Sequence, residues 1–107
     1  MTTFDNREKA AEGKFALDAE MEFKARARRD RLVGAWAAEK LGLSGAAVAE
    51  YAKSLVIADM EEAGDGDVIR KLKADFAAKG VVVTDQQIDG VLNEKMGEAV
   101  AQIKAGV

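Results

Sequence analysis

The sequence predicts an all-α protein, a compact antiparallel four-helix bundle, from three observations. The 107 residues include no proline, so no position forces a helix to kink or stop. Alanine, glutamate, lysine and arginine, which favour helix, are abundant along the chain. Glycines and capping residues divide the chain into four segments with helical periodicity. Connectors of about two to five residues favour antiparallel neighbours around a single core.

The first helical segment is expected to begin near Asp5 and to continue to Lys40. Asp5 can cap a helix, and Glu8 stands three residues further on, as in a capping box. Gly42 supplies a left-handed stop, and Leu43 follows it as the usual apolar contact.

The length of this segment predicts two parts, a flexible N-terminal arm of residues 1–18 and a bundle domain of residues 19–107. An unbroken helix would be about 54 Å long and would overhang the later, shorter helices. On the arm, Phe4, Ala11 and Phe15 recur at spacings of seven and four residues, which makes one narrow apolar stripe. An exposed aromatic side chain favours an amphipathic helix that docks in a partner's groove. The alternative is a frayed first helix that packs late.

Three further helices are expected. Ser44 and Asp65 are the expected N-caps of the second and third helices, and Gly80 ends the third. Residues 81–83 are all valine and read as a short extended connector. Thr84 then begins the fourth helix with a capping box.

The apolar positions of these helices follow the helical period and should face the core. They are Val48, Tyr51, Ala52, Leu55, Val56 and Met60, then Val68, Ile69, Leu72 and Phe76, then Ile88, Val91, Leu92, Met96, Ala99, Val100 and Ile103. Gly90 and Gly97 lie inside the last helix, where the lack of a side chain would let another helix approach closely.

Catalysis has no visible basis in the sequence. The chain has no histidine and no cysteine, which removes the commonest general base and the usual zinc ligands. The acidic run at residues 61–67 lacks the ligand spacing of a calcium loop, and no glycine-rich phosphate loop occurs. We therefore expect a protein that is not an enzyme, with no catalytic residue and no metal site.

The chain is also expected to be soluble and cytoplasmic. Its first residues turn charged at once and lack the apolar region of a signal peptide. The longest uncharged run, residues 41–49, is too short to cross a bilayer. The absence of cysteine agrees with a reducing compartment. We expect no insertion into a membrane.

A basic stretch at residues 24–31 is the main candidate for ligand binding. Residues 21–40 carry a charge of +3, although the whole chain carries −3. Guanidinium groups match phosphate oxygens, which favours a phosphate-bearing small molecule, and a solvated helical face is the alternative. Nucleic acid is disfavoured because no aromatic side chain is interleaved to stack bases. Trp36 is expected to anchor the core, with ligand stacking as the alternative.

Several stretches share the pattern of one family. They are MTTFDNREKA at residues 1–10, KFA at 14–16, FKARARR at 23–29, GAWAAEKLGL at 34–43, YA at 51–52, and residues 59–67. Together they resemble the zeta subunit family, the inhibitors of alphaproteobacterial F-type ATP synthase, over essentially the whole chain. Residues 36–43 and the first ten residues are the most specific. Ala11, Gly13 and Leu17 depart from the family pattern.

This resemblance implies that the arm enters the catalytic α/β interface of the F1 sector, beside the γ subunit, and blocks rotation in the hydrolytic direction. The arm residues expected to contact F1 are the apolar anchors Phe4 and Phe15 and the charged Arg7, Lys9 and Lys14. Such a protein would lie at the inner face of the plasma membrane through its contact with the synthase, and would be a monomer when free.

Family members also bind ADP or ATP on the bundle, so the resemblance implies a regulatory adenine nucleotide, although no cofactor is required. The residues that we assign to it are Arg28, Arg31, Trp36 and Lys40. The alternative function is a nucleotide-sensing helical bundle with weak or no inhibitory activity. A third interpretation is a basic helix that binds nucleic acid or anionic lipid.

Overall fold

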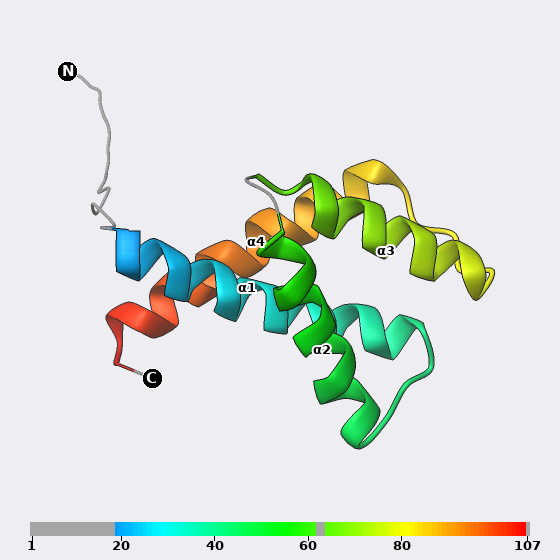
Figure 1. Ribbon diagram of the computed structural model, residues 1–107, viewed down its shortest axis with the longest axis horizontal. Coiled ribbons are helices and arrows are strands. Elements are labelled where there is room, and N and C mark those ends of the chain that lie inside the picture. Colours follow the sequence, from blue (N-terminus) through cyan, green and yellow to red (C-terminus); the bar gives the residue numbers. More distant parts are fainter. Residues whose placement is uncertain (1–18, 62–63, 107) are drawn as a thin grey trace.

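The computed structural model describes residues 19–61 and 64–106, which form four helices and no strand (Figure 1). The helices are α1 (Ala19–Lys40), α2 (Ala46–Asp59), α3 (Gly66–Ala78) and α4 (Asp85–Lys104). The predicted all-α four-helix bundle is confirmed. The predicted arm, with the expected cap at Asp5, lies outside the described residues.

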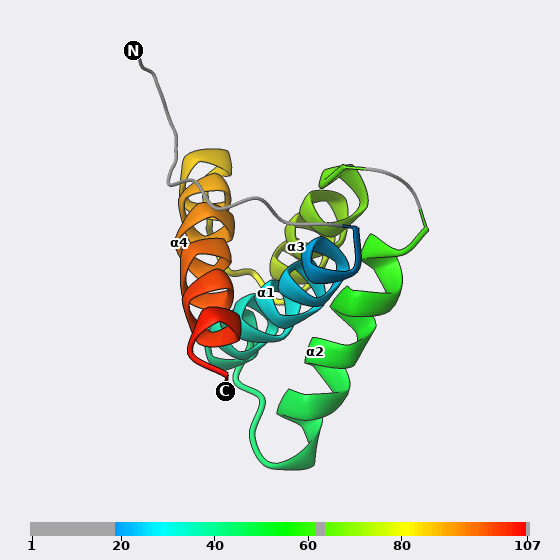
Figure 2. The same ribbon diagram turned by 90° about the vertical axis from the view of Figure 1, so that its left-hand side faces the viewer.

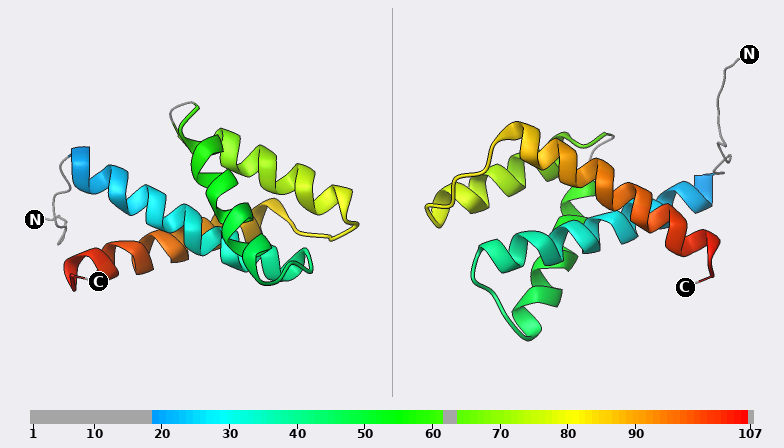
Figure 3. Two further views of the ribbon diagram at one scale, coloured as in Figure 1. Left: turned by 60° about the horizontal axis from the view of Figure 1, so that its bottom comes forward. Right: turned by 180° about the vertical axis from the view of Figure 1, so that it is seen from behind.

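α1 is the central helix of the bundle. α2 and α4 pack on opposite sides of it, and each crosses it at an angle (Figures 1 and 2). α3 packs against α2, and its Phe76 meets Trp36 of α1 edge to face, with ring centroids 5.6 Å apart. The start of α1 and the end of α4 lie at the same end of the molecule, where the two helices diverge (Figure 3).

Two helices end at glycines, as the sequence predicts. After α1, Gly42 has a φ of +79°, and the Leu43 amide donates to the carbonyl of Ala38 at 2.9 Å. After α3, Gly80 has a φ of +70°, and the Val81 amide donates to the carbonyl of Phe76 at 2.9 Å. Both ends satisfy carbonyl groups that the helix itself leaves without a donor.

The start of α4 is also as predicted, whereas the start of α2 is not. The Gln87 amide donates to Thr84 Oγ1 at 3.1 Å, and the Thr84 amide donates to Gln87 Oε1 at 2.8 Å, which is a complete capping box. Ser44 was expected to cap α2, but the N-cap is Gly45, with a φ of +62° and no side-chain cap. The left-handed Gly45 adds one residue to the turn, so α2 begins one position later.

The core contains most of the side chains predicted to face inward. Its buried members are Val33, Ala37, Leu41, Leu55, Val68, Leu72, Phe76, Ile88 and Leu92. Met60 is an exception, because it is the C-cap of α2 and is 64% exposed. α2 ends at Asp59, one residue before Met60, so the helical period no longer directs the Met60 side chain toward the core.

Close packing of two helices occurs at a glycine other than the two that were predicted to allow it. Gly90 and Gly97 face open space, since a methyl group at either would have no neighbour within 4 Å. Gly34 of α1 makes the close contact instead, and a methyl group there would lie 2.6 Å from Ala52 Cα. This contact holds α1 and α2 near each other and sets the position of the cavities between them.

Candidate functional site

The five arm residues predicted to contact a partner, Phe4, Arg7, Lys9, Lys14 and Phe15, lie outside the described residues. The remaining candidates belong to α1, and their surroundings come from α2, α3 and α4.

The four residues assigned to a nucleotide do not converge on one cavity. Trp36 and Lys40 do lie together, with Lys40 Nζ 5.4 Å from the ring centroid of Trp36. Arg28 reaches α4, where its Nη1 donates to Gln102 Oε1 at 3.5 Å. Arg31 is exposed and lines a cavity beside α2. Since Arg31 and Lys40 are nine residues apart, they project from opposite sides of α1.

The cavity at Arg31 is a groove of about 450 Å³ between α1 and α2. Its apolar lining comes from α2 and includes Ala52, Val56 and Ile57. Arg31 and Lys53 supply a cation from each helix, and both side chains are exposed. Within the described part of the chain, neither charged group has an ion-pair or hydrogen-bond partner. The groove therefore places two positive charges beside an apolar surface, an arrangement that suits an anion with an apolar body.

Sequence reasoning did not identify Lys53. It is one charged residue on the exposed side of α2, and only the packing of α2 on α1 brings it to the same groove as Arg31. No local motif could have indicated this pairing.

Two other arginines of the basic stretch turn inward and join α1 to the rest of the bundle. Arg26 Nη2 donates to Asp59 Oδ1 at 2.6 Å, and Arg26 Nε donates to Asp59 Oδ2 at 3.3 Å. Arg29 donates to Asp30 Oδ1 through Nε at 3.0 Å and through Nη2 at 2.8 Å. Its Nη1 donates to Asp65 Oδ1 at 2.9 Å. We call these five residues the charge cluster.

The charge cluster explains why Asp65 does not act as a side-chain cap. Asp65 is the N-cap residue of α3, as predicted, but its side chain makes no capping hydrogen bond. The carboxylate binds Arg29 and fastens the start of α3 to α1.

Asp30 is the most unusual member of the cluster. Its side chain is wholly buried, and among the described residues its Oδ2 has no hydrogen-bond partner. Burial and, after it, the neighbouring Asp59 raise the pKa of Asp30 to about 7, although Arg29 opposes the rise. A carboxyl group in this state can hold a proton near neutral pH.

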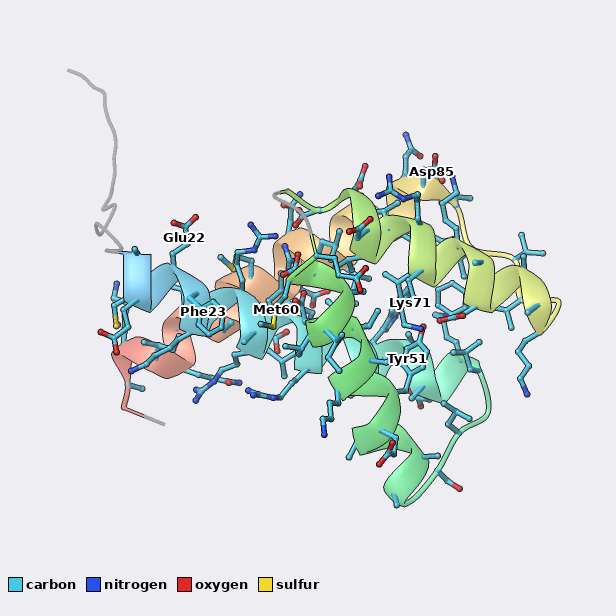
Figure 4. The ribbon with its side chains drawn as sticks, in the orientation of Figure 1. Glu22, Phe23, Tyr51, Met60, Lys71 and Asp85 are labelled. Carbon is cyan, nitrogen blue, oxygen red and sulfur yellow. The ribbon has the colours of Figure 1, made fainter. Side chains whose placement is uncertain are left out.

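A second cavity, of about 290 Å³, lies beside the charge cluster. Asp30 and Asp59 line it, together with the exposed side chains of Phe23 and Met60 (Figure 4). It places two carboxylates of the charge cluster next to a partly apolar surface.

A polar contact between α2 and α3 lies apart from these features. Tyr51 Oη donates to Asp75 Oδ2 at 2.7 Å, and Lys71 Nζ lies 3.1 Å from the same oxygen (Figure 4). Burial and the nearby Asp75 carboxylate raise the pKa of Tyr51 above its ordinary value, so the phenol stays protonated and serves as a donor.

The described residues contain no group of three or more side chains suited to hold a metal ion. None of the four helices combines the length and the apolar character needed to cross a membrane.

Comparison with known proteins agrees with the resemblance seen in the sequence. The family model described as ATPase inhibitor subunit zeta matches residues 1–102. A protein structure solved by solution NMR is 40% identical to this chain, with a TM-score of 0.72, and the match covers 81% of this chain and 99% of that one. No curated protein sequence matches the chain. Because the family match spans nearly the whole sequence, the chain belongs to the ATPase inhibitor subunit zeta family.

Proposed function

We propose that this protein inhibits ATP hydrolysis by the F1 sector of an ATP synthase, by inserting a helix from residues 1–18 into the catalytic α/β interface. The observation that carries the proposal is the family match, which begins at residue 1 and so includes the arm. A steric block needs only to stabilise one rotational state of the motor, so it requires no reactive group. The protein would act on the cytoplasmic side of the plasma membrane, through its contact with the synthase.

In this proposal Phe4 and Phe15 are the apolar anchors of the arm, and Arg7, Lys9 and Lys14 make the charged contacts. Truncating a buried aromatic anchor at an interface commonly costs about 2 kcal/mol or more. Phe15→Ala should therefore weaken inhibition by roughly thirtyfold.

Phe23→Ala is the matched control for Phe15→Ala. Phe23 is 56% exposed on the first turns of α1, eight residues beyond Phe15 and outside the arm. Both variants are compared in ATP hydrolysis by the isolated F1 sector. Phe15→Ala should lose inhibition, and Phe23→Ala should retain it. If Phe23→Ala loses inhibition and Phe15→Ala retains it, the inhibitory surface lies on the bundle, beside the cavity of about 290 Å³ that Phe23 lines.

We also propose a regulatory ADP or ATP site in the groove between α1 and α2. Arg31 and Lys53, which have no charged partner among the described residues, support it because they could bind phosphate oxygens from both sides. The apolar lining of the groove could receive the adenine ring. Of the four residues predicted from the sequence, this site uses Arg31, whereas Arg28, Trp36 and Lys40 do not line the groove.

The nucleotide site is tested by the thermal midpoint of the isolated protein. ADP or ATP well above its dissociation constant should raise the midpoint, since it binds only the folded state. Lys53→Glu should remove this rise, and Lys40→Glu should preserve it. If only Lys40→Glu removes it, the phosphates bind near Trp36 instead. No rise at millimolar nucleotide would exclude the site, and a rise without inhibition of F1 would favour a nucleotide sensor.

A further inference from the structure

Three carboxylates and two guanidinium groups meet where α1 packs against the end of α2 and the start of α3. The carboxylates belong to Asp30, Asp59 and Asp65, and the guanidinium groups to Arg26 and Arg29. One negative charge is therefore left over if all five groups are ionised. The Asp30 side chain is 0% exposed and the Asp59 side chain 7%. An uncompensated charge in such a place is costly, and binding a proton removes it.

Asp30 and Asp59 approach each other around one nitrogen atom. Arg29 Nη2 lies 2.8 Å from Asp30 Oδ1 and 3.6 Å from Asp59 Oδ2. Asp30 Oδ1 accepts both hydrogen bonds from Arg29, whereas Oδ2 has no donor among the described residues. A protonated Oδ2 would become a donor itself, and the Asp59 carboxylate, which shares Arg29 Nη2 with Asp30, would be its acceptor.

We infer that Asp30 and Asp59 share one proton in the folded protein, and that this proton strengthens the attachment of α1 to α2 and α3. The proton is held on Asp30 Oδ2 and donated to Asp59, which keeps its two hydrogen bonds from Arg26. Loss of the proton leaves two carboxylates beside one shared guanidinium nitrogen. Their repulsion acts on the junction of the three helices, because Asp59 is the last residue of α2.

The charged groups that face this carboxyl pair come from α1 and from the start of α3. α1 contributes Arg26 and Arg29, which hold the pair from one side. The start of α3 contributes Asp65, which lies 2.9 Å from Arg29 Nη1 and 3.4 Å from Arg26 Nη2. α4 contributes the neutral Gln102, which bonds Arg28 rather than a member of the cluster. Asp65 competes for the same arginines, so it adds to the negative charge that the proton offsets.

The pH range over which the proton stabilises the protein follows from the pKa of Asp30 in the folded protein and in the unfolded chain. Its pKa is about 7 in the folded protein, against roughly 4 in an unfolded chain. Between these values the folded state binds more protons than the unfolded state, so stability falls as the pH rises. The stabilisation by the proton on Asp30 is complete at a pH below the pKa of Asp30 in the unfolded chain. It is lost once the pH passes the pKa of Asp30 in the folded protein. Within this range the folding equilibrium constant falls by up to about tenfold per pH unit.

The test compares wild type, Asp30→Asn and Asp89→Asn in chemical denaturation from about pH 5 to about pH 8. Asparagine at position 30 keeps an acceptor for Arg29 and a donor toward Asp59, but it does not titrate. Asp89 is exposed on α4 and provides the matched control. Wild type and Asp89→Asn should lose stability as the pH rises and level off above about pH 7. Asp30→Asn should lack this loss.

A second measurement does not depend on how the variant folds. Carbon-13 NMR of the aspartate carboxyl groups in the wild-type protein should show Asp30 titrating near neutral pH. Titration of Asp30 near pH 4, or the same pH profile for Asp30→Asn and wild type, would overturn the inference. Both experiments use the isolated protein, so their outcome is independent of any effect on F1.

Discussion

Replacing Gly34 with alanine should destabilise the protein, although alanine is the better helix former. A methyl group at position 34 would lie 2.6 Å from Ala52 Cα and 2.8 Å from Ala52 Cβ. Carbon atoms in ordinary contact are about 3.5–4.0 Å apart, so α1 and α2 would have to separate by roughly 1 Å. The nearest atom belongs to the backbone of α2 and cannot rotate away as a side chain can.

The expected size follows from two opposed effects. Overpacking of this kind costs about 1–3 kcal/mol, and a clash with a helix backbone belongs at the upper end. The better helix propensity of alanine offsets about 1 kcal/mol of this loss of stability. The net loss is then about 2 kcal/mol, and in a domain of this size the thermal midpoint should fall by roughly 10 °C.

Gly90→Ala and Gly97→Ala provide the matched controls. Both glycines lie inside α4, and a methyl group at either would have no neighbour within 4 Å. Only the propensity effect applies there, so each change should stabilise the protein by up to about 1 kcal/mol. Urea and thermal denaturation, followed by circular dichroism, measure all three variants. If Gly34→Ala stabilises the protein as much as Gly90→Ala does, then α1 and α2 do not approach as closely as described.

Two further substitutions test single contacts. Thr84→Ala removes the capping box of α4 and should lower the free energy of unfolding by about 1 kcal/mol. Thr84→Ser keeps the hydroxyl group and should therefore keep most of the wild-type stability. Equal losses in the two variants would show that the methyl group of Thr84 matters rather than its hydroxyl group. Tyr51→Phe removes the hydrogen bond to Asp75 and should cost about 1 kcal/mol in denaturation. An unchanged stability would mean that Lys71, which also binds Asp75, satisfies the carboxylate alone.

The helix ends could be predicted because they depend on neighbours in the sequence. The end of α1 at Gly42 needs only a left-handed residue and a carbonyl a few positions earlier. The capping box at Thr84 likewise involves a residue three positions away. The family resemblance could be seen for a similar reason, since it depends on residues read in order.

The arrangement of the site could not be predicted, because it depends on which helices meet. Arg26 binds Asp59 across 33 positions, and Arg29 binds Asp65 across 36. One available hint was that the acidic residues 59–67 and the basic residues 24–31 are of opposite charge. Gly34 is indistinguishable from Gly90 in the sequence, since each lies inside a helical segment. Only the crossing of α1 and α2 gives Gly34 its role.

The most direct test of the central claim is ATP hydrolysis by the isolated F1 sector, with the full chain and with a variant that contains residues 19–107 alone. We expect the full chain to inhibit hydrolysis and the shortened chain not to inhibit it. The shortened chain should keep its thermal midpoint, because the buried apolar residues of the described part of the chain run from Ala25 to Ala99 and are all retained. Equal inhibition by both proteins would show that the bundle, rather than the arm, is the inhibitory element.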